Sequence, residues 1–349
     1  MNNKKIILVD RLDSALGIAA ARRASVVNAD VVAIMNFRTP KQLAIFLDSG
    51  KYDLMVFSWR RGLLEAMCSP NFRKFISANR TKTKIGLVVA DYLGLDKRFF
   101  EQERHLINYV DVYWTTNQEL FDKYSFTEKI SSPIGVLHDI PDYVNIVKIR
   151  NEKIKKNRLI WVGNSGWGSN YGVKDHKGFR EIIEPLFIKL RGIIPDYEFC
   201  IIDSFEKSRS NLEVLNYIAE SRIILQASVN EGTGLPFLEG IGLGTIPITT
   251  DVGVASELLR KDFSNLLVDR SVDSFAEAIC KTLNEDFGRI DTLIEIFESH
   301  IRKIVAESME CSSTSTNHRY KGNTRIMNLF RIYLLWRFRN YRVRRLGEN

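Results

Sequence analysis

The sequence is poor in cysteine and proline and has no long apolar run. Its 349 residues include eight prolines and four cysteines. The cysteines have none of the C-x-x-C spacing of metal or redox sites, so we expect reduced thiols: Cys68, Cys200, Cys280 and Cys311. No stretch reaches the roughly 18 apolar residues of a membrane helix, and the run at 6–9 is too short for a signal peptide. These absences favour a cytoplasmic protein.

Patterns for metal ligation and for several common active sites are also missing. None of the five histidines is spaced with another histidine or a cysteine as metal ligands usually are. There is no Walker loop and no nucleophile elbow. We therefore expect no metal site.

The excess of positive charge is confined to the C-terminal tail. The chain has 50 Lys and Arg against 42 Asp and Glu, and nine of these bases but only one acid lie in residues 319–349. The rest of the chain carries 41 charges of each sign, which disfavours a protein that coats nucleic acid. Over 319–345 the arginines alternate with aromatic and aliphatic residues, a composition that suits an anionic membrane surface. Packing back onto the protein and RNA binding are the alternatives for this tail.

Short apolar runs alternate with helical patterns along the chain, as is typical of parallel sheets with crossover helices. We expect strands in two series, at 6–9, 31–35, 54–59, 85–90 and 112–116, then at 159–162, 199–202, 223–226, 246–249 and 266–268. The sequence thus predicts an α/β protein with two doubly wound Rossmann-like domains, at 1–150 and 151–310, facing a central cleft. A linker and basic tail follow at 311–349. Ligands of such sheets bind beyond the carboxyl ends of the strands.

Two amphipathic helices stand out between these runs. Apolar residues repeat with helical spacing from Phe179 to Leu190, and Pro185 should kink or split that helix. A second apolar stripe covers 290–305. The charged segment 151–158 is a candidate hinge, and the polar segment 311–317 is a candidate linker.

The most informative segment is 230–259. Residues 231–234 form a glycine-bearing turn after a strand, and Pro236 suits the first turn of the helix that follows. A glycine loop therefore leads into the amino end of a helix, where free N–H groups face an anion. Glu231 precedes the loop and Glu239 lies about one turn into the helix. Carboxylates at these positions can accept hydrogen bonds from sugar hydroxyls.

This segment resembles the Glu-x7-Glu signature of family 4 retaining glycosyltransferases (glycosyl transferases group 1), which have the two-domain GT-B fold. The match runs from Glu231 through Pro236 and the Gly244–Pro247 stretch to Glu257. The resemblance implies that Glu231 faces the donor sugar and that Glu239 holds the ribose of the nucleotide. It also implies loop contacts to sugar and phosphate from Gly232, Thr233, Gly234 and Leu235.

A second stretch, after the strand that ends at Gly163, supports the resemblance. In the family, a Gly-Arg pair and a Lys-Gly pair here supply two cations to the donor diphosphate. Lys177 corresponds to the lysine, but Asn164 stands where the arginine is usual. Lys174 or Arg180 could supply the second charge instead.

The first half resembles the family only in outline. The double glycine of the first loop is reduced to Gly17. Ala90 occupies the position of a histidine that contacts the donor sugar in many members, and Asp91 is the nearest polar group. Candidate acceptor contacts just past the strand ends are Asp10, Arg11, Ser14, Arg60 and Arg61.

The resemblance implies transfer of a sugar from a nucleoside diphosphate sugar to an acceptor hydroxyl, with retention of anomeric configuration. Glu231, Lys177 and Asp91 are then the catalytic candidates. The donor-binding candidates are Gly163, Asn164, Lys177, Gly232, Thr233, Gly234, Leu235 and Glu239. We expect no cofactor beyond the donor, and a glycan or lipid-linked glycan acceptor in the synthesis of a bacterial surface polysaccharide, at the inner face of the membrane. The alternatives are a nucleotide-sugar epimerase or hydrolase, and a catalytically degenerate scaffold module.

Overall fold

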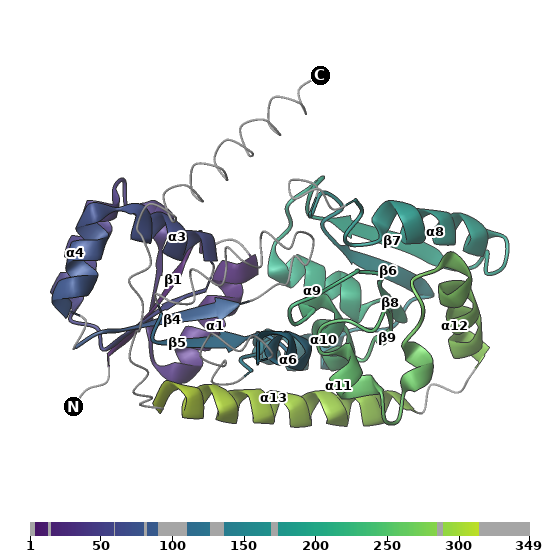
Figure 1. Ribbon diagram of the computed structural model, residues 1–349. Helices are drawn as coiled ribbons and strands as arrows, with labels where there is room; N and C mark the ends of the chain where they lie inside the picture. The colour runs from purple at the N-terminus through teal and green to yellow at the C-terminus, as the bar shows by residue number, and fades with distance from the viewer. Residues whose placement is uncertain are drawn as a thin grey trace, which may run out of the picture. The chain divides into compact units, whose positions relative to one another are not determined.

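The computed structural model describes residues 4–12, 15–58, 60–79, 82–89, 110–125, 136–168, 174–284 and 289–313 (Figure 1). These residues divide into two compact units. The first unit contains the described residues up to Asp139 and those from Val305 onward, and the second unit is Ile140–Ile304. Each unit is built on its own parallel sheet.

The first unit has a five-stranded sheet in the order β2-β1-β3-β4-β5, with every pairing parallel. Its strands are β1 (Lys5–Val9), β2 (Asp30–Ala33), β3 (Leu54–Phe57), β4 (Lys84–Val89) and β5 (Val112–Thr115). Its helices are α1 (Ala15–Val27), η1 (Ile34–Asn36), α2 (Pro40–Gly50), α3 (Arg60–Cys68), α4 (Pro70–Asn79) and α6 (Gln118–Ser125). Thr39 caps α2 by accepting a hydrogen bond from Gln42 N, and Pro40 opens the helix, as helix starts favour.

Strand β1 shows why this sheet is covered on both faces. Ile6 and Leu8 pack into one core with Phe72 of α4, whereas Ile7 and Val9 pack into another with residues of α1. Alternate residues of a strand point to opposite faces. A strand that is apolar at every position therefore belongs to a sheet with helices on both sides.

The second unit has a four-stranded parallel sheet in the order β7-β6-β8-β9. Its strands are β6 (Arg158–Gly163), β7 (Glu198–Asp203), β8 (Ile223–Gln226) and β9 (Ile246–Thr249). Its helices are α7 (Tyr143–Glu152), η3 (Phe179–Ile183), α8 (Glu184–Arg191), α9 (Asn211–Ala219), α10 (Leu235–Gly242), α11 (Ala255–Leu259), η4 (Ser264–Leu266), α12 (Val272–Asn284) and the first part of α13 (Ile290–Ser313). Helices α8 and α12 pack together with η3, and α7, α9 and α10 form a second group.

The two doubly wound parallel sheets confirm the predicted fold class. Pro185 also acts as predicted, because it lies in the first turn of α8, directly after the π-helical turn η3. The strand predicted at 266–268 is wrong. The chain makes the 3-10 turn η4 there, and only Leu267 forms a bridge, to Thr249.

The unit boundary lies earlier than the sequence pattern predicts. That pattern puts the boundary after residue 150, but the contacts divide the chain between Asp139 and Ile140. The reason is that α7 packs against α9 and α10 and so groups with the second unit. Residues 311–313, predicted to begin a linker, instead continue α13. Among the helices of the described residues, none combines the length and the apolar composition that a membrane crossing requires.

Candidate functional site

The carboxyl ends of β6 and β8 bring several of the predicted site residues together. A cavity of about 60 Å³ lies there, and its wall includes Gly163, Lys177, Ser228, Glu231 and Pro236. These residues come from the end of β6, the loop before η3, the loop after β8 and the start of α10. Their position fits the rule that open parallel sheets bind ligands beyond their carboxyl ends.

Lys177 and Glu231 form an ion pair at this cavity. Lys177 Nζ lies 2.5 Å from Glu231 Oε1, and Ser228 Oγ donates a hydrogen bond of 2.6 Å to the same oxygen. The two charged side chains are 20% and 13% exposed, so the pair is largely removed from solvent. Ser228 is a site residue that the sequence pattern did not single out.

The loop that carries Lys177 has a tightly determined backbone. Asp175 and Gly178 both have positive φ, at 46° and 70°. A Cβ at Gly178 would lie 2.3 Å from the carbonyl oxygen of Ala227, so only glycine fits. The loop is also bound to the chain after β8, because Val229 N donates to His176 O at 2.9 Å.

Arg270, which the sequence analysis missed, joins this loop to the end of β8. Its Nε donates to Ala227 O at 3.0 Å, and its Nη2 donates to Asp175 O at 2.8 Å. Its Nη1 pairs with Glu181 Oε2 at 2.8 Å. No local pattern marks this residue, because the two carbonyl partners lie 43 and 95 positions away in the chain.

His176 lies buried among these charges. Burial, together with the nearby charges of Lys177 and Arg270, lowers the pKa of His176 to about 4, and Glu231 partly opposes this shift. The imidazole is therefore neutral near pH 7. Its Nδ1 has no hydrogen-bond partner within the described part of the chain.

The glycine loop before α10 packs against Gln226 and against Gly253. Gly234 is the N-cap of α10 with φ of 79°, a conformation that favours glycine. Gln226 lies under it, since its Oε1 would be 3.1 Å from a Cβ at Gly234. A Cβ at Gly253 would lie 2.9 Å from Thr233 O, and Val254 N donates to that same oxygen at 3.4 Å. Gly253 and Val254 thus pack directly against the loop.

The free backbone N–H groups at the amino end of α10 give that end of the helix a partial positive charge. Gly232, Thr233 and Gly234 are buried and Leu235 is half-buried. Glu239 is only 4% exposed and does not line the cavity. The structure therefore brings Glu231 into contact with Lys177. Glu239, by contrast, lies in α10 about one turn after the start of the helix.

Asn164 follows Gly163 but does not line the cavity. Its Oδ1 is buried and has no partner among the described residues, and its carbonyl accepts a hydrogen bond from Trp167 N. The two other candidate cations of this region, Lys174 and Arg180, are exposed.

Several predicted residues lie outside the described chain. These are Ser14, Ala90, Asp91 and the tail at 319–345, together with the side chains of Arg60 and Arg61. Asp10 and Arg11 are described, just past β1. The loop there passes close to α1, since a Cβ at Gly17 would lie 2.0 Å from Arg11 O.

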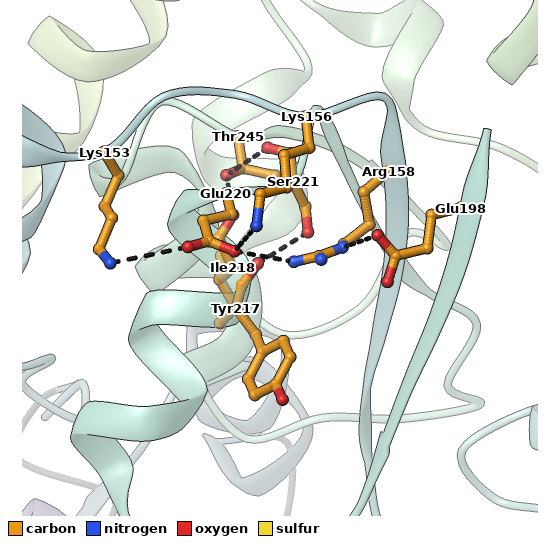
Figure 2. A network of polar contacts seen from close by, with 9 residues as sticks. All are labelled: Lys153, Lys156, Arg158, Glu198, Tyr217, Ile218, Glu220, Ser221 and Thr245. Carbon is orange, nitrogen blue, oxygen red and sulfur yellow. Dashed lines mark hydrogen bonds and ion pairs between the residues drawn. The ribbon is translucent and has the colours of Figure 1, made fainter. Parts of the chain in front are cut away.

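The amino ends of the same strands carry a separate polar network (Figure 2). Glu220 pairs with Lys153, Lys156 and Arg158, and Arg158 also pairs with Glu198. The Arg158 side chain is only 7% exposed, so these partners satisfy a nearly buried charge. The segment 151–158, predicted as a candidate hinge, is thus held to the rest of the second unit by these ion pairs.

Comparison with known proteins gives the class of this fold and site. Residues 204–295 match the family described as Glycosyl transferases group 1. The chain is similar in structure to a glycosyltransferase from Rickettsia africae, with 11% identity, a TM-score of 0.58, and coverage of 89% of this chain and 98% of that one. It is similar to a trehalose-phosphate synthase from Burkholderia xenovorans, with 9% identity, a TM-score of 0.65, and coverage of 88% and 98%. It is also similar to Anabaena HepE in complex with UDP and glucose, with 12% identity, a TM-score of 0.58, and coverage of 88% and 97%. A search of curated proteins gave no match.

The fold is therefore that of the GT-B glycosyltransferases. The segment that matches the model of the glycosyl transferases group 1 contains both Glu231 and Glu239. The resemblance stated from the sequence is thereby confirmed.

Proposed function

We propose that this chain transfers a sugar, with retention of configuration, from a nucleoside diphosphate sugar to a hydroxyl group of a glycan acceptor. The observation that carries this proposal is the Lys177–Glu231 pair at the loop that leads into α10. One cation and one carboxylate meet there beside the amino end of a helix. Such an arrangement offers positive charge to a diphosphate and a hydrogen-bond acceptor to the hydroxyls of a sugar.

Lys177, Glu231, Glu239 and the glycine loop before α10 each have a role in this proposal. Lys177 and the N–H groups at the start of α10 bind the diphosphate and stabilise the charge that develops on it as the leaving group. Glu231 faces the sugar and Glu239 binds the ribose. Because the chain itself supplies the positive charge, the proposed reaction needs no divalent metal.

The proposal extends to the acceptor and to the place of the reaction in the cell. The resemblance favours a lipid-linked or polymeric glycan acceptor in the synthesis of a bacterial surface polysaccharide, at the cytoplasmic face of the membrane. The tail at 319–345 would provide contact with the anionic surface. Flotation of the full chain with anionic and with zwitterionic vesicles tests this part, and equal binding to both would contradict it.

Nucleotide binding is the first test of the proposal. Thermal unfolding of the full chain is measured with UDP, GDP, ADP and dTDP, each with and without Mg²⁺. A ligand at 100 times its Kd stabilises by about 2.7 kcal/mol, and each kcal/mol corresponds to about 2–4 °C for a domain of roughly 150–250 residues. We expect a shift with one base, independent of Mg²⁺, that is lost in Lys177→Ala and Glu239→Ala. No shift with any of the four would contradict the proposal.

The products distinguish transfer from the other reactions that this fold could perform. With the donor that carries the selected base, ¹H NMR identifies the anomer of the first product formed. A retained anomer on the acceptor supports the proposal. An inverted anomer would contradict retention, and release of free sugar that is insensitive to acceptor would indicate a hydrolase.

A further inference from the structure

Arg270 lies in the short connection between η4 and α12, and its side chain bridges three separate parts of the second unit. Nε donates to Ala227 O, Nη2 donates to Asp175 O, and Nη1 pairs with Glu181. These partners belong to the end of β8, the loop before η3 and η3 itself. A guanidinium group holds its donors in a fixed planar fork, so the three contacts together determine one relative placement of the three segments.

The bridged segments are the ones that carry the two charged residues of the site. Asp175 lies two residues before Lys177, so Arg270 fixes the loop that presents the ammonium group. Ala227 directly precedes Ser228, and Ser228 Oγ donates to Glu231 Oε1. Arg270 therefore contacts neither Lys177 nor Glu231 directly, but binds the backbone of the segment next to each of them.

The loop before η3 needs such an external support. Asp175 has φ of 46°, a left-handed conformation that is uncommon for residues other than glycine. Its carboxylate stabilises the turn by accepting hydrogen bonds from Arg180 N and Glu181 N, at 3.1 and 2.8 Å. The hydrogen bond from Arg270 to Asp175 O then ties this strained turn to β8.

Arg270 is not placed to bind a phosphate itself. Each of its three nitrogen atoms already donates to a protein acceptor at 2.8–3.0 Å. Its side chain is 26% exposed and does not line the cavity. Its charge is also opposed by Glu181 and by Asp175, whose carboxylate lies 3.7 Å from Nη2.

We propose that Arg270 is a positioning residue of the donor site, which holds the loops of Lys177 and Glu231 in the relative placement that the terminal phosphate and the sugar require. This inference rests on the proposed function, since it specifies how the same site is assembled. It predicts that Arg270 acts on the part of the ligand that Lys177 contacts and leaves the nucleoside part unaffected.

The test compares a nucleoside diphosphate with its monophosphate on the full chain. UDP and UMP are titrated by isothermal calorimetry, or the guanosine, adenosine or thymidine pair if the base panel selects one of these. In Arg270→Met we expect UDP affinity to fall about tenfold, the effect of one lost hydrogen bond to a charged group. UMP affinity should stay within about twofold of the wild type. Arg209→Met is the matched control, because Arg209 is an ion-paired arginine of similar exposure on the same unit, and both affinities should be unchanged in it.

Arg270→Lys separates position from charge. Lysine keeps the positive charge but not the fork, so we expect it to bind UDP as weakly as Arg270→Met does. Full recovery of UDP affinity in Arg270→Lys would show that charge alone is needed and would overturn the proposal. Should Arg270→Met fail to fold, Glu181→Gln weakens one of the three contacts at an exposed partner, and a selective loss of UDP affinity is again expected.

Two other results would also overturn the inference. Equal losses for UMP and UDP would show general structural support, and no loss for either would show that Arg270 is dispensable. A wild-type chain that binds none of the four nucleoside diphosphates would instead contradict the proposed function itself. The two failures are therefore distinguishable.

Discussion

Lys177 Nζ lies 2.5 Å from Glu231 Oε1, although the two residues are 54 positions apart in the chain. The cation proposed to bind the donor diphosphate is thus already neutralised by the carboxylate proposed to face the donor sugar. Binding a diphosphate requires the ammonium group to exchange or share this partner. The pair consequently sets the affinity of the site as well as its geometry.

Removing the charge of Glu231 should strengthen the binding of nucleoside diphosphate. In Glu231→Gln the competing carboxylate is lost, so we expect affinity for the selected diphosphate to rise about three- to tenfold. Sugar transfer should fall by a factor on the order of 10², because an interaction in the transition state is lost. Calorimetry and initial rates measure the two effects. Glu213→Gln removes an exposed partner of Arg209 and serves as control. Weaker diphosphate binding in Glu231→Gln would show that the pair supports the site and does not compete with the ligand.

Gly253→Ala should disturb the glycine loop before α10. The added Cβ would lie 2.9 Å from Thr233 O, and the backbone has φ of 62°. We expect about 1–2 kcal/mol of destabilisation from the left-handed conformation, and weaker nucleotide binding because the loop must move. Gly192→Ala is the control, since φ there is −81° and the nearest atom to its Cβ is 3.8 Å away. Urea unfolding and calorimetry measure the two effects. An unchanged nucleotide affinity in Gly253→Ala would mean that the contact of Gly253 with Thr233 does not position the loop.

Two buried histidines should make the second unit sensitive to acid. Burial lowers the pKa of His176 and of His300 from 6.5 to about 4. The unfolded chain therefore takes up these protons first, so stability is full above pH 6.5 and is lost as the pH falls towards 4. Between pH 7.5 and 5 each histidine accounts for about 2 kcal/mol of that loss.

Substitution of His300 separates the contribution of this histidine to the pH dependence of stability from the contribution of the carboxylates. In His300→Gln the difference in unfolding free energy between pH 7.5 and pH 5 should shrink by about 2 kcal/mol relative to the wild type. Urea unfolding followed by tryptophan fluorescence measures it. An unchanged difference would show that His300 is protonated as easily in the folded chain as in the unfolded one.

Glu220→Ala should reduce stability without affecting the ligand site. It removes the carboxylate that pairs with Arg158, whose side chain is only 7% exposed (Figure 2). We expect a cost of about 1–3 kcal/mol, because a nearly buried charge loses a partner. The Lys156 hydrogen bond lowers the pKa of Glu220, so the contribution of this carboxylate is present at neutral pH and is lost as the pH falls through that lowered pKa. Nucleotide affinity should not change, since the network lies at the amino ends of the strands; a changed affinity would contradict this separation.

The fold was largely predictable because its strands are buried on both faces. Ile6, Ile7, Leu8 and Val9 illustrate this, since the four residues divide between two cores and so form a continuous apolar run. The split at Pro185 was predictable from the missing N–H of proline. The unit boundary was not, because it depends on the packing of α7 against helices that follow it by many residues.

The glycine loop of the candidate site was predictable because its residues are close in the sequence. The loop from Glu231 to Leu235 could be read from spacing, because the glycines, the proline and the helix follow each other directly. Arg270 could not, since it acts through carbonyl oxygens that any residue possesses. The pairing of Lys177 with Glu231 likewise needed the fold, because nothing in either segment specifies its neighbour.

The division of the chain bears on the order of its synthesis. The first unit includes residues on both sides of the second, because the described residues from Val305 onward group with those up to Asp139. A ribosome must therefore make all of the second unit before the last part of the first exists. Translation that stops before Val305 would leave the first unit without its final segment, whereas the second unit, continuous from Ile140 to Ile304, would already be whole.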